Sequence, residues 1–282
     1  MSQILVLTAI DVEARGLARH LGLAAVSTSD WPHYRGGVLE VACVGLRAAC
    51  LAERAAVWRR PTLVVSAGTC GGLAPDLATG ALVVPEAVIG PEGARFVTAA
   101  LPPLGRVGTL LTVADIVPTA GEKARLWIET GAVAVDMESA GLLEWARAMG
   151  VAAAVIRAVS DPATAGVPSD LAALVEPGGR VSRSQALRAL LARPGALADA
   201  VALGRGTGAA LKTVAAALGR VARIAGRRKR AICVAGGGEV VRRPSRHFRG
   251  SKISIISPLG SHWRPALTSH CGRLASGPFS SA

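Results

Sequence analysis

The 282-residue sequence is poor in aromatic residues, which make up 3% of it, and its five cysteines form neither a C-x-x-C pair nor a cluster with histidine. An odd number of scattered cysteines disfavours both a disulfide framework and a zinc site, so we expect small core or loop residues. Glycine, proline or charge breaks every long apolar stretch before the roughly 18 to 20 residues that a bilayer span needs. The first residues lack the basic segment of a signal peptide, and we predict a cytoplasmic protein.

Acidic residues are nearly absent from the C-terminal part. Residues 1–220 carry 20 Lys and Arg against 18 Asp and Glu, whereas residues 221–282 carry 12 against the single acid Glu239. A near-neutral body argues against a protein that coats nucleic acid along its length. After residue 226 the chain is rich in Arg, Ser, Gly and Pro without apolar periodicity, which predicts one domain at 1–226 and a basic, disordered tail at 227–282. A functional tail and a read-through or frame-shifted extension both remain open.

What the chain does contain is an alternation of apolar runs and helix-like segments. The apolar runs predict strands at 3–8, 38–44, 62–67, 80–88, 108–113, 132–135 and 151–159. Helix-like spacing occurs at 11–21, 120–129 and 138–149. Because the strands do not alternate in polarity, the pattern predicts an α/β fold whose central sheet is covered by helices on both faces. The run at 62–67 leads into five residues, Gly-Thr-Cys-Gly-Gly, that predict a glycine loop.

Four segments place polar residues where apolar strands or helices end, which is where α/β proteins gather their ligands. They are Ala-Ile-Asp-Val-Glu at 9–13, Ala-Gly-Thr-Cys-Gly-Gly-Leu at 67–73, Ala-Val-Asp-Met-Glu-Ser-Ala at 134–140 and Arg-Ala-Val-Ser-Asp-Pro at 157–162. In this order they resemble the nucleoside phosphorylase/nucleosidase superfamily over about residues 3–165. The Asp-Met-Glu-Ser and Val-Ser-Asp-Pro motifs, with the Arg/Leu/Pro helical region around 187–215, look most like its hopanoid-associated phosphorylase-like proteins.

The resemblance implies a three-layer αβα phosphorylase-type fold with a central mixed, partly barrel-like sheet, followed by helices. It also implies cleavage of a purine N-glycosidic bond, which leaves positive charge on the ribose and negative charge on the base. By resemblance, Asp161 protonates the base at N7 and Ser160 holds its carboxyl. Glu138 binds the ribose hydroxyls and balances the cation, Met137 packs on the sugar, and Glu13 activates the attacking water.

On the nucleophile side, the resemblance implies backbone N–H groups of the loop that contains Gly68 and Gly71, together with the Thr69 hydroxyl. Asp115 is a further candidate contact to base or sugar. The resemblance implies no metal ion or organic cofactor, and it implies a homo-oligomer.

Each candidate also has a purely structural interpretation. Glu13 could be a solvated acid in a first helical turn, Glu138 a carboxylate at a helix N-terminus, and Asp161 a turn residue. Met137 could belong to the core. Arg157 is expected mainly as an ion-pair partner, and Asp136 as a brace for its loop.

Hydrolysis is favoured over phosphorolysis. Hexameric phosphorylases carry an arginine two residues before the first glycine of this motif, and this chain has Ser66 there. The segment at 112–118 is aliphatic where relatives acting on small nucleosides place an aromatic residue. This favours a roomier apolar mouth and release of adenine from adenosylhopane, giving ribosylhopane. Nucleoside salvage on methylthioadenosine, S-adenosylhomocysteine, futalosine or purine nucleosides is the alternative, and a non-catalytic polyanion-binding protein is the second alternative.

The Ala/Leu/Arg-rich stretch at 183–226 predicts helix, interrupted by Pro194 and by Gly-Arg-Gly at 204–206. Its apolar faces and neighbouring cations suit either packing against the body or peripheral contact with an anionic membrane.

Overall fold

The computed structural model describes residues 3–167, 176–180 and 196–235, with side chains of the last range given for 201–227. The chain divides into one unit at Met1–Gly238 and a second at Glu239–Ala282, and the described residues all belong to the first. The strands are β1 (Ile4–Thr8), β2 (Ala24–Ala25), β3 (His33–Gly36), β4 (Leu39–Cys43), β5 (Leu63–Gly72), β6 (Leu82–Val83), β7 (Ala87–Ile89), β8 (Arg95–Val97), β9 (Thr109–Thr112), β10 (Ala134–Asp136) and β11 (Ala152–Asp161). The helices are α1 (Asp11–Leu21), α2 (Leu51–Ala55), α3 (Ala120–Thr130), α4 (Ser139–Ala148) and α7 (Ala196–Ala235), with short 3₁₀ turns η1 (Leu46–Ala48) and η2 (Pro91–Gly93).

The described strands form one mixed sheet in the order β2-β3-β4-β1-β5-β10-β9-β7-β8. The long strand β5 is its centre, because it pairs in parallel with β1 and β11 and then in antiparallel with β10. The strand β11 also pairs with the short β6, off the main path. This branched, mixed arrangement confirms the predicted fold class, with helices on both faces.

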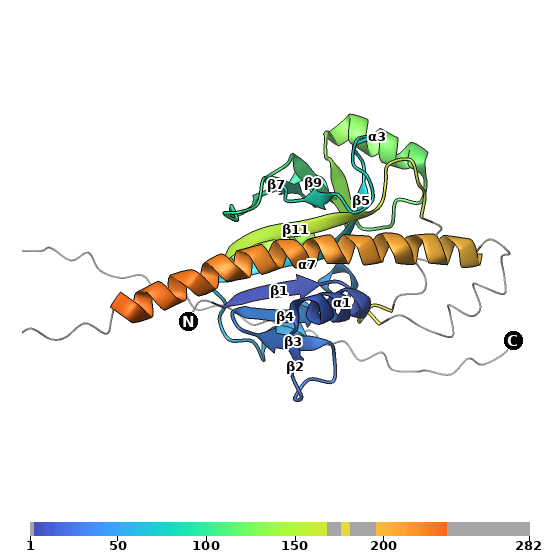
Figure 1. Cartoon of the computed structure of the whole chain (residues 1–282). Coiled ribbons are helices and arrows are strands. Elements are labelled where there is room, and N and C mark those ends of the chain that lie inside the picture. The colour runs from blue at the N-terminus through green and yellow to red at the C-terminus, as the bar shows by residue number, and fades with distance from the viewer. Residues whose placement is uncertain (1–2, 168–175, 181–195, 236–282) are drawn as a thin grey trace, which may run out of the picture. The chain divides into compact units, whose positions relative to one another are not determined.

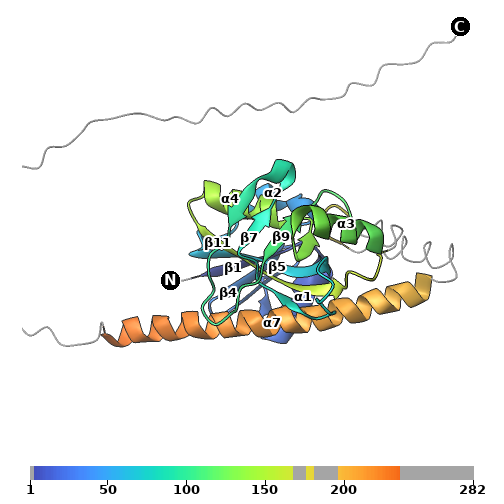
Figure 2. The same cartoon turned by 90° about the horizontal axis from the view of Figure 1, so that it is seen from above.

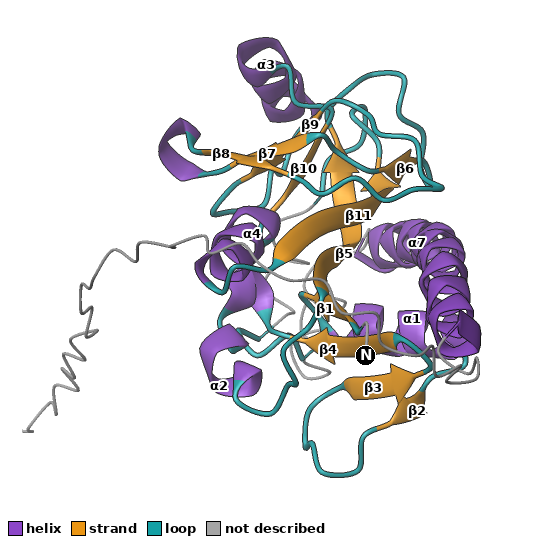
Figure 3. Ribbon diagram, turned by 90° about the vertical axis from the view of Figure 1, so that its left-hand side faces the viewer, coloured by secondary structure: helices purple, strands orange, loops and turns teal. Residues whose placement is uncertain are grey.

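Two helical layers cover the central strands. Helices α1 and α7 lie on one face, and α2 and α4 lie on the other (Figure 3). The first layer buries alternate residues of β1, β4, β5 and β11, and the second buries the intervening ones. Strands covered on both faces need apolar side chains at nearly every position, which explains the uninterrupted runs in the sequence.

Helix α7 is part of the body's core. It lies along β11 and against α1 (Figures 1 and 2). Its residues Leu211, Val214, Leu218 and Val221 are buried in the core cluster that also contains Leu17 of α1. These four side chains therefore pack against the body, as one of the two interpretations of the apolar face expects, and residues 183–195 of the stretch lie outside the described residues. In the described part of the chain, no helix is long and apolar enough to cross a membrane.

Three sequence predictions are wrong in detail. Gly68–Gly72 is not a loop, because β5 continues to Gly72 and pairs there with β10 and β11. The expected strand at 80–88 is two strands, β6 and β7, separated by an irregular segment at 84–86. Helix α7 runs through 204–206 without interruption, because glycine weakens but does not end a helix that is held by packing. The helix ends at Ala235. The domain boundary at residue 226 stays a prediction, and residues 236–282 and Pro194 lie outside the described residues.

Candidate active site

The carboxyl ends of β1, β10 and β11 meet at a cavity of about 770 Å³. Eight of the nine candidate residues line it: Glu13, Thr69, Gly71, Asp115, Met137, Glu138, Ser160 and Asp161. They come from parts of the chain as distant as α1 and β11, so only the sheet order brings them together. The remaining candidate, Gly68, lies directly behind the wall, next to Glu13 and Arg157.

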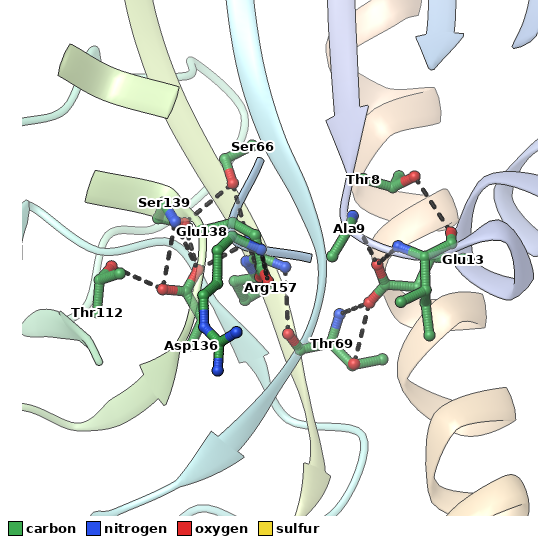
Figure 4. A network of polar contacts seen from close by, with 12 residues as sticks. Thr8, Ala9, Glu13, Ser66, Thr69, Thr112, Asp136, Glu138, Ser139 and Arg157 are labelled. Carbon is green, nitrogen blue, oxygen red and sulfur yellow. Dashed lines mark hydrogen bonds and ion pairs between the residues drawn. The ribbon is translucent and has the colours of Figure 1, made fainter. Parts of the chain in front are cut away.

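Glu13 is buried in the site and is not a solvated helix acid; its exposed fraction is 2%. One carboxylate oxygen, Oε1, accepts from the Thr69 backbone N–H at 2.8 Å and from the Thr69 hydroxyl at 3.0 Å. The other, Oε2, accepts from the backbone N–H groups of Ala9 at 3.1 Å and Ile10 at 3.4 Å. The strand-to-helix turn after β1 and the middle of β5 therefore hold this carboxylate from two sides (Figure 4).

Arg157 is the centre of a buried polar network between Glu13 and Glu138 (Figure 4). Its guanidinium lies 2.7 Å from Asp136 and 3.7 Å from Glu138, and it donates to the Thr69 carbonyl at 3.3 Å. Burial by itself lowers the pKa of Arg157. The surrounding carboxylates of Asp136, Glu138 and Glu13 together raise that pKa by more, so Arg157 stays charged. The ion-pair role expected for Arg157 is confirmed.

Asp136 braces its loop, as expected. Its carboxylate accepts from Thr112 at 2.7 Å and from the Ser139 hydroxyl at 2.5 Å, in addition to the Arg157 ion pair. These contacts fix the turn between β10 and α4, on which Met137 and Glu138 stand. Met137 is half-buried and faces the cavity, so it is not a core residue.

Glu138 differs electrostatically from the other acids. Burial, with smaller contributions from the charges of Asp136 and Glu13, raises the pKa of Glu138 to about 7, against the opposing charge of Arg157. One of its oxygens accepts from the Arg47 backbone N–H at 3.2 Å. A buried carboxylate that is costly to ionise gains most when positive charge develops beside it.

Asp161 ends β11 at an irregularity in its pairing with β5. Its Oδ1 accepts from the Ser160 hydroxyl at 2.6 Å, as the resemblance implies. Its Oδ2 lies 2.5 Å from the ammonium of Lys123, which the sequence reasoning missed. Lys123 is the single lysine of α3, but its partner could not be found without the fold.

Gly68 and Gly71 are required by close packing within β5. Gly68 has a φ of 156°, and a Cβ there would lie 2.5 Å from the Glu13 carboxylate and 2.8 Å from the Arg157 guanidinium. A Cβ on Gly71 would lie 3.1 Å from Asp161 Oδ2. The two glycines therefore let three functional side chains approach the same strand. The Thr69 N–H between them is used by Glu13.

Asp115 lies at the mouth and is 85% exposed along its side chain. It pairs with Arg47 at 2.8 Å, and the same guanidinium donates to the Ala114 carbonyl at 2.5 Å. Arg47 has a left-handed backbone, with φ of 51°, and it joins the segment after β4 to the segment after β9. The cavity lining also contains apolar side chains, of which Ile116, Val117 and Pro118 directly follow Asp115 in the chain; the others are Leu46, Val167 and Leu203.

A mixed sheet between helical layers, with a carboxylate-lined cavity at its strand ends, defines an α/β enzyme. The model of the phosphorylase superfamily matches residues 42–105 and 98–192, and the chain belongs to that superfamily. A futalosine hydrolase from Streptomyces coelicolor is 31% identical over 196 residues, which are 56% of this chain and 83% of the relative. The chain is therefore an N-glycosidase or nucleoside phosphorylase, as predicted.

Solved structures agree with the fold. A methylthioadenosine/S-adenosylhomocysteine nucleosidase from Helicobacter pylori has a TM-score of 0.58 and 17% identity, covering 78% of this chain and 97% of its own. The futalosine hydrolase of the same organism has a TM-score of 0.57 and 17% identity, and the match covers 78% of this chain and 97% of that one. A methylthioadenosine nucleosidase from Arabidopsis thaliana has a TM-score of 0.56 and 18% identity, and the match covers 78% of this chain and 96% of that one.

Proposed function

We propose that this protein hydrolyses the N-glycosidic bond of a purine nucleoside, with water as the nucleophile. The observation that carries the proposal is the charge of the cavity. Its described lining holds five carboxylates, Glu13, Asp115, Asp136, Glu138 and Asp161, against three cations, Arg47, Lys123 and Arg157. Each cation is paired with one of these carboxylates. Because each described cation already has a carboxylate partner, the lining offers no unpaired cation to a phosphate dianion, while its carboxylates stabilise a developing ribosyl cation.

The three candidate catalytic acids occupy different parts of the cavity and suit different steps. Asp161, the last residue of β11, pairs with Lys123 as a carboxylate; it takes up a proton from solvent and passes it to the leaving purine, while the Ser160 hydroxyl holds its carboxyl. Glu138 accepts from the ribose hydroxyls and balances the positive charge on the ring. Glu13 orients and deprotonates the attacking water, beside Thr69, whose hydroxyl can turn from Glu13 toward that water.

For the substrate we propose adenosylhopane, cleaved to adenine and ribosylhopane in hopanoid biosynthesis. The cavity has the volume of a site for a drug-sized ligand, which is more than a nucleoside alone requires. Its mouth is aliphatic, and the described lining contains no aromatic residue to close over a small purine nucleoside. An apolar 5′ substituent fits this mouth.

Futalosine is the second candidate substrate, and one observation favours it: the Streptomyces coelicolor relative at 31% identity is named a futalosine hydrolase. Methylthioadenosine and S-adenosylhomocysteine are supported only at the level of the fold.

The test is a side-by-side assay of the full chain. Adenosylhopane in detergent, futalosine, methylthioadenosine and S-adenosylhomocysteine are each supplied with and without phosphate, and the base and sugar products are identified. We expect free sugar, no dependence on phosphate, and the highest kcat/KM with adenosylhopane. Formation of a sugar 1-phosphate would overturn hydrolysis, and a preference for futalosine would overturn the lipid substrate alone.

A further inference from the structure

Lys123 is an unusual residue for its position. It lies in the second turn of α3, after the Thr119 N-cap, and it is the buried residue of that helix, with 1% of its side chain exposed. Burial of an ammonium group is costly unless every N–H finds an acceptor. The hydrogen-bond acceptors around the Lys123 ammonium therefore indicate what this buried lysine does.

The acceptors all come from residues 161–165, which are the last residue of β11 and the segment after it. The Nζ atom lies 2.5 Å from Asp161 Oδ2, 2.8 Å from the Ala165 carbonyl oxygen and 3.0 Å from the Pro162 carbonyl oxygen. The Asp161 carbonyl oxygen is a fourth, longer contact at 3.3 Å, and an ammonium has three N–H donors, so these acceptors use all of them. Lys123 thus keeps no donor for a substrate, although it stands in the cavity wall.

The same contacts restrict Asp161 on both sides. Lys123 holds Oδ2, the Ser160 hydroxyl holds Oδ1, and Gly71 leaves space for the carboxylate against β5. The torsion that turns a carboxylate is intrinsically soft, so its direction depends on such donors. One acceptor direction of each oxygen remains for a ligand.

We propose that Lys123 is a positioning residue, which directs the Asp161 carboxylate toward the purine and ties α3 to residues 161–165. The proposal rests on the proposed function, in which Asp161 acts on the base. Lys123 acts through Asp161 and does not touch the substrate. Its loss should therefore slow the step that releases the base, more than it weakens capture of the nucleoside.

The experiment compares two variants in the full chain. Lys123→Met keeps the alkyl chain and removes all N–H donors. Lys123→Gln keeps two N–H donors, enough for the Pro162 and Ala165 carbonyls, but carries no charge for Asp161. Arg125→Met, on the exposed side of the same helix, is the matched control. Folding is followed by circular dichroism and thermal melting, and if Lys123→Met fails to fold, Lys123→Gln decides.

We expect kcat for the substrate that the wild type cleaves best to fall about ten- to hundredfold in both variants, with KM changed less than about threefold. Arg125→Met should match the wild type. In an Asp161→Asn background, Lys123→Gln should cause no further loss. Unchanged kcat in a folded Lys123→Gln variant, or equal losses with and without Asp161, would overturn the positioning role. If the wild type cleaves no nucleoside, or Asp161→Asn keeps full turnover, the proposed function fails instead.

Discussion

Replacing Glu138 by glutamine should stabilise the protein at neutral and alkaline pH while removing its activity. The pKa of Glu138 rises from 4.5 to about 7 on folding, mainly because of burial. Between these two values the folded state keeps a proton that the unfolded chain releases, so the wild type loses stability as pH rises through this window. At about 1.4 kcal/mol per unit, the loss amounts to about 3 kcal/mol above pH 7. The glutamine side chain does not titrate, so the variant does not lose this stability as the pH rises.

The assay is chemical denaturation of the wild type and Glu138→Gln at about pH 4.5 and about pH 8. At each pH we subtract the free energy of unfolding of the wild type from that of the variant. We expect this difference to be about 2 to 3 kcal/mol larger at about pH 8 than at about pH 4.5. Glu144→Gln is the matched control, because Glu144 is an exposed residue of the same helix α4. Turnover by Glu138→Gln should fall about a hundredfold or more, because the balancing carboxylate is gone. A difference in stability that does not change with pH would refute the reasoning.

Three further changes test other parts of the structure. Asp161→Asn should lower kcat by about a hundredfold or more, because the general acid is lost. It should also lower the melting temperature, because the buried Lys123 ammonium loses its counter-ion. Wild-type turnover by this variant would remove Asp161 from the mechanism. Gly68→Ala should lower activity about tenfold or more in steady-state assays, because its Cβ would displace the Glu13 carboxylate or the Arg157 guanidinium; full activity would show that both can shift freely. Leu218→Ala, at a fully buried position of α7, should cost about 3 kcal/mol in urea denaturation, and a cost below about 1 kcal/mol would contradict the packing of α7 as core.

Much of the site could be predicted because its residue types follow strand ends. Glu13, Glu138 and Asp161 lie within short motifs whose order along the chain is specific, and the cavity does contain all three. Arg157 was expected to form an ion pair and Asp136 to brace its loop, but that the two pair with each other is seen only in the structure. Lys123 and the bridge from Arg47 to Asp115 were not predicted, because their partners lie 38 and 68 residues away in the chain. No local pattern encodes such a contact.

The regular elements show the same division. Helix α1 matches its predicted bounds, because amphipathic spacing and a terminal glycine are local signals. The glycines of β5 were misassigned, because a glycine pair normally indicates a turn and only pairing with β10 and β11 keeps it extended. The glycines of α7 were misassigned for a related reason, since burial against α1 and β11 outweighs their low helix propensity.

By itself, the sequence determined the α/β class and the near-neutral charge of residues 1–220, since these depend on local pattern and composition, and the resemblance of its motifs to a known family indicated the three candidate catalytic acids. Only the tertiary structure decided what state those acids are in. It buried Glu138 beside two other carboxylates, gave Glu13 four hydrogen-bond donors and placed a lysine against Asp161. The physical reason is that the free energy of a charge depends on every group within a few ångströms, and in this fold those groups come from distant parts of the chain.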